Sequence, residues 1–373
     1  MFPMKGVLAM ELYDGAGNVA RFGEVISAGG EGEVRASACW DDVVVKLYRD
    51  PSPERRAKVE SLAVLGSMIN TFGHGPLQHV CWPLCPVYAD AHQEEFLGFC
   101  MKRAPEGSIP LSELYRYPHV DHGVSHAERV DVLLRLVDIL DALHGSSFGG
   151  HPLVVGDLSG DNVLVSPCGD VCLIDADTFS FANDGALYPC MACAPGVAPP
   201  ELLRAARGRS YQQMAEAGEQ TFTVESDRFA LASLIFRTLG NGVHPFEGCA
   251  EPDPDGDYPL PPDVDIQVRK GASPFVGTAP GIALAPWAIP LEHVPPILAG
   301  AYRRSLFSGP GDVPRVTEEQ WRRILENYRD HVTVCPEGHA FHEDFKNSAG
   351  LPACPYCAAD RRFAARRDEL CFR

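Results

Sequence analysis

The chain has 373 residues, of which 45% are hydrophobic and 22% are charged, as in ordinary soluble globular proteins. This length allows two packed lobes and a small appended module. The formal net charge of −18 argues against a general nucleic-acid-binding protein and against a partner of acidic membranes. No apolar run approaches the ~20 residues that span a bilayer, and residues 1–15 lack the features of a signal peptide. We therefore expect a cytoplasmic protein. Its odd number of cysteines, 13, favours reduced thiols and metal ligands over a disulfide framework.

The first hundred residues predict strands, one glycine-rich turn and one helix. Residues 11–22 fit a β-hairpin, and residues 26–34 (ISAGGEGEV) place Gly29 and Gly32 between two strand-like runs. Glycines there let backbone N–H groups approach a phosphate, although a simple hairpin turn explains them as well. A buried strand over residues 43–46 ends in Lys46, which read alone is a solvated strand-end charge. Residues 53–68 predict a helix with Glu60 near its middle.

Two more strands and a central helix follow. Residues 81–88 and 96–101 are expected to be strands, and residues 102–107 have the composition of a connector between lobes. Residues 124–147 predict an amphipathic helix whose apolar surface is wide enough for the centre of a lobe. Gly145 suits its C-terminal end.

The segment at residues 153–181, LVVGDLSGDNVLVSPCGDVCLIDADTFSF, carries the candidate chemistry. Asp157 and Asn162 lie in a polar turn after a short apolar strand, and Asp175 ends a second apolar run. A hairpin turn at residues 167–170 folds the segment back and brings these side chains together. Two carboxylates and a carboxamide form the oxygen-rich set that Mg²⁺ and a phosphoryl acceptor need. Any one of them alone is more often a turn residue, but three at these spacings favour a site.

These segments resemble the motifs of protein kinases, in the same order along the chain. GDLSGDN resembles the catalytic loop, DAD the D-F-G segment and VVVK the strand that carries the phosphate-binding lysine. In the glycine loop, Gly29, Gly32 and Val34 match the second glycine, the third glycine and the valine, and Ser27 replaces the first glycine.

The resemblance implies roles for the matched residues. Asp157 would orient the acceptor hydroxyl, and Lys46 would hold the α- and β-phosphates of ATP and pair with Glu60. Asn162 and Asp175 would bind Mg²⁺.

Residues outside this set also have implied roles. The backbone around Met101 would hydrogen-bond adenine. Asp227 would anchor the backbone of the catalytic loop and also fits the N-cap of a helix over residues 221–239. Glu201, in an A-P-E-like segment, would pair with an arginine such as Arg315, which precedes Trp321 as at the end of kinase domains.

Several positions depart from the kinase pattern. Val155 and Gly156 replace the His-Arg pair before the catalytic aspartate, so the loop should not need a phosphorylated activation segment. Ser159 replaces the lysine of serine/threonine kinases, and Asp177 stands in place of the glycine of D-F-G. These changes leave the rate and the substrate class open.

The last forty residues predict a metal site. Cys335 and His339 form one pair, and Cys354 and Cys357 form a second, with turn residues inside each pair. Such a set is typical of a structural zinc ribbon, and His342 is the alternative histidine ligand. A module of fewer than about 40 residues rarely folds without a metal or other staple.

We therefore expect an α+β chain with a bilobal protein-kinase-like fold: a β-rich N-lobe (residues 10–101), a helical C-lobe (residues 102–328) and a zinc-ribbon module and tail (residues 329–373). The expected activity is that of a serine/threonine protein kinase that uses ATP, Mg²⁺ and a protein substrate. A pseudokinase scaffold is the alternative, and a small-molecule kinase is disfavoured by the A-P-E-like and His-Pro-Phe segments. The chain is similar to the kinases of tellurium-resistance-associated triads, which implies a von Willebrand A-domain protein and a metal-dependent phosphatase as partners.

Overall fold

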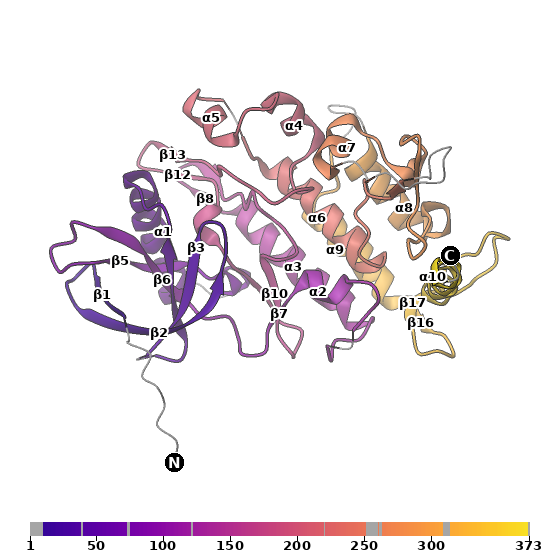
Figure 1. Cartoon of the computed structure of the whole chain (residues 1–373), viewed down its shortest axis with the longest axis horizontal. Helices are drawn as coiled ribbons and strands as arrows, with labels where there is room; N and C mark the ends of the chain where they lie inside the picture. Colours follow the sequence, from indigo (N-terminus) through magenta and orange to yellow (C-terminus); the bar gives the residue numbers. More distant parts are fainter. Residues whose placement is uncertain are drawn as a thin grey trace, which may run out of the picture. The chain divides into compact units, whose positions relative to one another are not determined.

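The computed structural model of the chain describes residues 10–38, 40–72, 75–120, 122–219, 221–250, 260, 263–308 and 314–371 (Figure 1). Most of the segment on which the signal-peptide expectation depends therefore lies outside the described residues. The chain forms two compact units. The first comprises the described residues up to Glu106 together with Cys172–Asp177, and the second comprises the others, from Gly107 onward.

The first unit is a closed antiparallel barrel with one long helix. Its strands are ordered β1-β2-β3-β4-β6-β5 around the barrel. Their bounds are β1 Met10–Asp14, β2 Val19–Ala28, β3 Gly32–Ser37, β4 Val43–Tyr48, β5 Pro83–Tyr88 and β6 Phe96–Lys102. The helix α1 spans Pro53–Phe72, and the short 3₁₀ turn η1 spans Pro76–His79.

The alternation of side chains along β4 fixes the environment of its lysine. Val45 and Leu47 belong to one buried cluster, whereas Val44 and Tyr48 belong to another that includes Val59 of α1. Because successive residues of a strand point to opposite faces, Lys46 lies on the face of Val44 and Tyr48. Lys46 is only 5% exposed, so the predicted strand-end lysine is a buried charge.

The second unit is mainly helical. Its helices are α2 Leu111–Tyr115, α3 Glu128–Gly145, α4 Pro200–Ala206, α5 Tyr211–Glu216, α6 Val224–Leu239, α7 Val264–Lys270, α8 Pro296–Tyr302, α9 Glu318–Asp330 and α10 Pro355–Cys371. A π-helical turn, Arg303–Phe307, continues α8, and the other 3₁₀ turns are Ala176–Thr178, Pro274–Val276 and Leu291–His293. The helix α3 packs against α6 and α9 (Figure 1). The broad apolar surface of α3 is buried, as its sequence predicts, and most residues of α6 are buried as well.

Short strands pair between and beside these helices. They are β7 Ile109–Pro110, β8 Ser147–Phe148, β9 His151–Pro152, β10 Val163–Val165, β11 Val171–Leu173, β12 Phe181–Asn183, β13 Ala186–Tyr188, β14 Cys249–Ala250, β15 Ile282–Ala283, β16 Val332–Val334 and β17 Ala340–His342. The turn between β10 and β11 is closed by the Ser166 N–H, which donates to the Asp170 carbonyl at 2.8 Å. This turn is the hairpin that the sequence predicts in the catalytic segment.

Several boundaries differ from the expected ones for local reasons. The helix α3 begins at Glu128 rather than at residue 124, because Ser125 and Glu128 exchange hydrogen bonds that close its first turn. The N-cap of α6 is Thr223, which forms a capping box with Ser226, so the expected N-cap role of Asp227 is wrong. Residues 172–177 belong with the barrel, although the sequence assigns them to the helical lobe.

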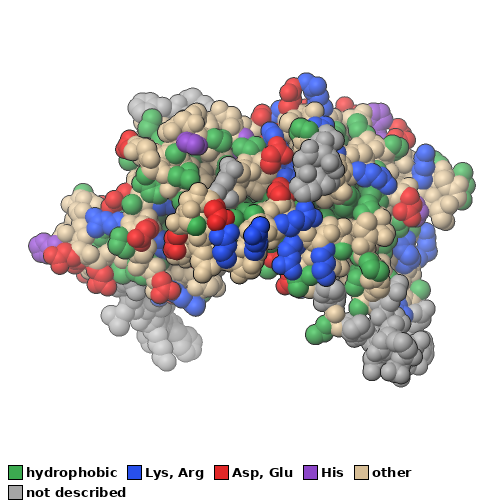
Figure 2. Space-filling model, turned by 90° about the horizontal axis from the view of Figure 1, so that it is seen from above, with side chains coloured by type: hydrophobic (Ala, Val, Ile, Leu, Met, Phe, Trp, Pro, Cys, Tyr) green, Lys and Arg blue, Asp and Glu red, His purple; other side chains and the backbone are tan. Residues whose placement is uncertain are grey.

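The described surface carries charges of both signs. Figure 2 shows acidic and basic side chains interspersed on one face, with hydrophobic side chains scattered among them. Among the described residues, no helix is long and apolar enough to cross a membrane.

Candidate functional site

The first unit holds a buried ionic cluster around Lys46. The Nζ atom of Lys46 lies 3.0 Å from both carboxylate oxygens of Asp177 and 3.1 Å from Oδ1 of Asp175. Burial alone would lower the pKa of Lys46, but the charges of Asp177 and Asp175 outweigh burial and raise this pKa, so the lysine stays charged. The fold therefore brings together the predicted phosphate-binding lysine and the predicted magnesium ligand Asp175.

The backbone at Asp175 is held in an unusual conformation. Its φ of 57° lies in the left-handed region, which a non-glycine residue adopts rarely and which aspartate tolerates better than most. Burial raises the pKa of Asp175 more than the charge of Lys46 lowers it. Backbone strain and a shifted carboxylate are both common where a chain positions a functional group.

Glu60 does not pair with Lys46, so this prediction is wrong. Its Oε1 accepts hydrogen bonds from Arg56 Nε at 2.8 Å and from the Tyr88 hydroxyl at 3.2 Å, and its side chain is 44% exposed. Val59 faces the core, and the next residue of a helix is turned by about 100° from it. A position near the middle of the helix was therefore not enough to place this carboxylate.

The glycine-rich turn joins β2 to β3. A Cβ at Gly32 would lie 2.0 Å from the Leu47 carbonyl oxygen, so glycine is required there for β3 to approach β4. A Cβ at Gly29 would meet nothing within 4 Å, which leaves space for a ligand at this side of the turn. Val34 packs against the cluster that contains Val44 and Tyr48.

The same turn brings an acidic side chain to the lysine. Glu31 lies in the turn and approaches Lys46 Nζ to 3.8 Å with Oε2. An anionic group of the glycine-rich turn thus lies within reach of Lys46.

Met101 has a different setting from the expected one. Its Cα partners are Val44 of β4 and Pro83 of β5, so its strand is paired on both sides. Its side chain is 5% exposed and belongs to the cluster of Val44 and Phe99. The predicted role of its backbone in binding adenine stays a prediction.

The second unit brings Asp157 and Asn162 together. Asn162 Nδ2 donates to Oδ2 and to the main-chain carbonyl of Asp157, each at 3.0 Å. Both bonds use the amide nitrogen, which leaves the carboxamide oxygen for a cation. Asp157 Oδ1 accepts from the Ala194 N–H at 2.8 Å, which ties the catalytic loop to the segment that matches an activation loop.

Asp227 anchors the backbone of the catalytic loop, as the resemblance implies. Its side chain is fully buried and accepts hydrogen bonds from the N–H groups of Val155 at 2.7 Å and Gly156 at 2.9 Å. A third bond comes from His144 Nε2 at 2.9 Å, while His144 Nδ1 lies 2.9 Å from Glu318 Oε1. Only a doubly protonated imidazole donates to both carboxylates, so this network contains a buried imidazolium.

The charges of this network explain its pKa values. Burial would lower the pKa of His144, but the hydrogen bonds to Asp227 and Glu318 outweigh burial and raise it from 6.5 to about 9. Burial would raise the pKa of Glu318, but bonds from His144 and Arg228 lower it to about 2. The sequence shows no histidine before the catalytic aspartate, and His144, at the end of α3, supplies one from another element.

Gly156 occupies the position where the kinase pattern has an arginine, and its surroundings leave no space for one. Its φ is +75°, and a Cβ there would lie 2.6 Å from the Cβ and Sγ atoms of Cys190. The catalytic loop therefore packs directly on the activation-loop-like segment, with no space for a long cationic side chain. The packing supports the expectation that this segment is held without a phosphate.

The ion pair between Glu201 and Arg315 is present. Nη1 and Nη2 of Arg315 donate to Oε1 and Oε2 of Glu201 at 2.7 and 2.9 Å, which is a bidentate pair. It connects α4 to the segment before α9, as the resemblance implies.

The four predicted zinc ligands converge in the last segment of the second unit. Their ligand atoms all lie within 4.8 Å of one another. His339 Nδ1 is 3.6, 3.7 and 3.3 Å from the sulfurs of Cys335, Cys354 and Cys357. Tetrahedral zinc with Zn–S bonds of about 2.3 Å requires separations of about 3.5 to 3.8 Å. The residues therefore fit Zn²⁺, whereas His342 stacks on His331 and packs at a tilt against Tyr328.

A buried cation near the metal ligands supports this fit. Arg129 is 4% exposed, and its Nε and Nη1 atoms have no hydrogen-bond partner. Its charge acts on His126, whose ring lies 5.8 Å from the ring of His339. A zinc ion with three thiolates and one imidazole has a net charge of −1, which would offset Arg129.

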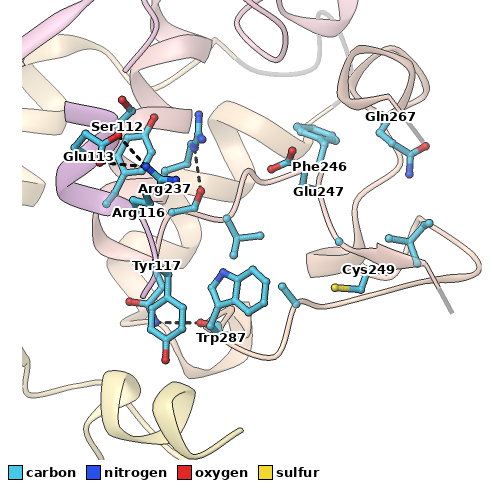
Figure 3. A pocket seen from close by; sticks show the side chains of 17 residues that line it. Ser112, Glu113, Arg116, Tyr117, Arg237, Phe246, Glu247, Cys249, Gln267 and Trp287 are labelled. Carbon is cyan, nitrogen blue, oxygen red and sulfur yellow. Dashed lines mark hydrogen bonds and ion pairs between the residues drawn. The ribbon is translucent and has the colours of Figure 1, made fainter. Parts of the chain in front are cut away.

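The metal-ligand module packs against two aromatic residues that line a pocket in the second unit. The pocket has a volume of about 530 Å³, and Figure 3 shows Tyr117 and Trp287 beside one another at its edge. Their rings stack at 5.9 Å, and Phe363 of α10 packs edge-on against both. The Tyr117 hydroxyl donates to Asp360 of α10 at 2.7 Å.

The opposite side of the pocket touches the catalytic loop. Ser112 donates a short hydrogen bond from its hydroxyl to Asp161, and a Cβ at Gly160 would lie 2.2 Å from the Tyr115 hydroxyl oxygen. Tyr115 lines the pocket together with Ser112, which is labelled in Figure 3. This pocket is not predictable from the sequence, because its lining comes from several distant segments.

Comparison with known proteins agrees with this geometry. No family model matches the chain. Protein kinase YegI of Escherichia coli strain K12 is 25% identical over 353 residues, which cover 95% of this chain and 51% of the relative. The protein of the same name from Escherichia coli O157:H7 is 26% identical over 351 residues, 94% of this chain and 50% of that relative. The chain thus spans about half the length of the curated relatives it matches.

Solved structures give the fold. The Toxoplasma gondii specific rhoptry antigen kinase domain has a TM-score of 0.52 and 14% identity, and the match covers 87% of each chain. The ROP18 kinase domain, in complex with AMP-PNP and sucrose, has a TM-score of 0.51 and 12% identity, covering 86% of this chain and 84% of its own. The chain therefore has a protein-kinase-like fold with mixed helices and strands, and its sequence is similar to that of a bacterial protein kinase.

The His144 network predicts a pH-dependent stability. A group whose pKa is raised by folding contributes stability below its unfolded pKa, 6.5, and loses it as the pH rises through its folded pKa, about 9. We expect the free energy of unfolding to fall by about 3 kcal/mol over this window. The measurement is urea unfolding between pH 6 and 10.

Two variants separate this contribution from other titrations. His144→Gln should flatten the pH dependence in this window, and His92→Gln, on an exposed turn, should leave it unchanged. An unchanged slope in His144→Gln would assign the pH dependence to other groups.

The ligand geometry predicts one zinc ion per chain. Cys354→Ser should lower the zinc content and the melting temperature. A module of this size has too small a hydrophobic core to fold by itself, so the bound metal contributes to its stability. Cys168→Ser, at an exposed cysteine, should change neither. Elemental analysis and thermal unfolding of the purified proteins test this, and equal zinc in both variants would contradict the assigned ligands.

Proposed function

We propose that this protein is an ATP- and Mg²⁺-dependent serine/threonine protein kinase. The observation that carries the proposal is the meeting of the right groups within each unit: Lys46 with Asp175 at 3.1 Å in the first, and Asp157 with Asn162 at 3.0 Å in the second. The order of these residues along the chain and the fold of the domain support the same conclusion.

Each residue then has a defined task. Lys46, kept charged by its carboxylates, would bind the phosphates of ATP, and Gly29 and Gly32 would leave space for them. Asp175 and Asn162 would hold Mg²⁺, which neutralises phosphate charge during the transfer. Asp157, oriented by Ala194 and Asn162, would accept a hydrogen bond from the acceptor hydroxyl and direct it toward the γ-phosphorus.

The substrate would be a protein. The pocket next to the catalytic loop has aromatic walls and charged groups of both signs, including Glu113, Arg116 and Glu247. Such a surface suits a peptide segment better than a compact metabolite. A von Willebrand A-domain protein and a metal-dependent phosphatase remain the partners that the resemblance implies, and Zn²⁺ would be the structural metal of the C-terminal module.

A pseudokinase scaffold is the second candidate. Ser159 stands where a serine/threonine kinase carries a lysine that neutralises the transferring phosphoryl group. The described loop, residues 157–162, contains no lysine or arginine. Under this alternative the protein would bind nucleotide or a partner without phosphoryl transfer.

Transfer of ³²P from ATP to the protein itself or to a partner tests the choice. Asp157→Ala and Asp175→Ala should each reduce transfer at least about 10³-fold, because one loses the group that positions the hydroxyl and the other a metal ligand. Asp170→Ala, at an exposed aspartate of the neighbouring turn, is the matched control and should retain activity.

The pattern of results separates the candidates. If the wild type and Asp170→Ala are labelled and the two other variants are not, the result supports the proposed kinase activity. Nucleotide binding without label in any protein, with the proposed partners present, would support the scaffold.

A further inference from the structure

The carboxylate that pairs with Lys46 does not come from α1, where the kinase pattern places it. The helix that should supply a carboxylate supplies a cation, Lys58, which is 8% exposed and whose charge acts on Asp177. The expected helix carboxylate, Glu60, is bound to Arg56 and Tyr88. The carboxylate that Lys46 meets most closely comes from Asp177, the residue that replaces the glycine of D-F-G.

We propose that Asp177 is the positioning residue for Lys46 and takes over the task that a helix glutamate performs elsewhere in this fold. The inference rests on the proposed function, because it assigns Lys46 to the phosphates of a nucleotide. Asp177 touches neither phosphate nor metal in this role and acts through Lys46.

The contacts of Asp177 support this role. Both of its oxygens lie 3.0 Å from Lys46 Nζ, and Oδ2 also accepts a hydrogen bond from the Tyr48 hydroxyl at 2.7 Å. Its side chain is 5% exposed. A buried carboxylate that accepts three hydrogen bonds from two donors has little freedom, so the ammonium group that it binds is also fixed.

The local backbone delivers Asp177 to this place. Lys46 and Tyr48 lie on the same face of β4, two residues apart, and both donate to the one carboxylate. The 3₁₀ turn Ala176–Thr178 follows directly on the left-handed residue Asp175. Asp175 and Asp177 are therefore both presented to Lys46 from one short segment of the first unit.

The arrangement has a consequence for regulation. In this chain the partner of Lys46 lies two residues from the predicted magnesium ligand, and α1 contributes no carboxylate to the pair. Movement of α1 would then not make or break the ion pair of Lys46. The pair is assembled by the same segment that carries Asp175.

Equilibrium binding of ADP and adenosine provides a direct test. Asp177→Asn should weaken binding of ADP, measured without Mg²⁺, by about tenfold or more, since a buried ion pair loses one partner. Adenosine has no phosphate, so its affinity should change by less than about twofold if only Lys46 is misplaced. Asp177→Glu should recover part of the ADP affinity, and Glu60→Gln should match the wild type.

A double-mutant cycle separates positioning from general damage. In a Lys46→Met background, Asp177→Asn should cause no further loss of ADP affinity, because its effect passes through the lysine. Equal losses of ADP and adenosine binding, or additive losses in the cycle, would overturn the proposal. A loss seen only when Mg²⁺ is present would also overturn it and would make Asp177 a metal ligand.

The outcome is independent of whether the protein transfers phosphate. A wild type that binds ADP but gives no ³²P label would end the proposed kinase activity and leave the binding cycle interpretable. A wild type that binds no ADP, while folded by circular dichroism, would overturn the role of Asp177 together with nucleotide binding.

Discussion

The second unit depends on one buried carboxylate. Asp227 has no exposed surface, and it holds the N–H groups of Val155 and Gly156 directly before the catalytic aspartate. Such a charge is tolerated in the interior only when it is paired and fully hydrogen-bonded. His144 provides the compensating charge, and Glu318 and Arg228 extend the network to α9. The position of the catalytic loop is therefore determined by electrostatics at its base.

Both units solve the same physical problem in the same way. In each, a cation buried within the unit is held between two carboxylates: Lys46 between Asp175 and Asp177, and His144 between Asp227 and Glu318. In the first unit, one of the acidic partners, Asp177, occupies the position where the kinase pattern places a glycine. The departures at the catalytic loop and at D-A-D are thus compensated within the unit that carries them.

The sequence predicts the helices, strands and motifs better than it predicts which side chains pair with one another. Strong periodicity located α1, α3 and α6, and the ordered motifs located Lys46, Asp157, Asn162 and Asp175, because local pattern and chain order are both visible in a sequence. Glu60 was assigned wrongly because a helix position alone does not give the direction of a side chain. His144 and Asp177 were missed as partners because each meets its counterpart only after the chain folds over many residues. The four predicted zinc ligands converge as the sequence predicts, because their short spacings carry the geometry locally.

The stacked rings of Tyr117 and Trp287 belong to two sites at once. They form an edge of the pocket beside the catalytic loop, and they are fixed by Asp360 and Phe363 of the helix that begins between Cys354 and Cys357. Two ligands that order the same side chains are thermodynamically linked, and the linkage is reciprocal. A ligand in the pocket and a metal at the four ligands would therefore change each other's affinity by the same factor.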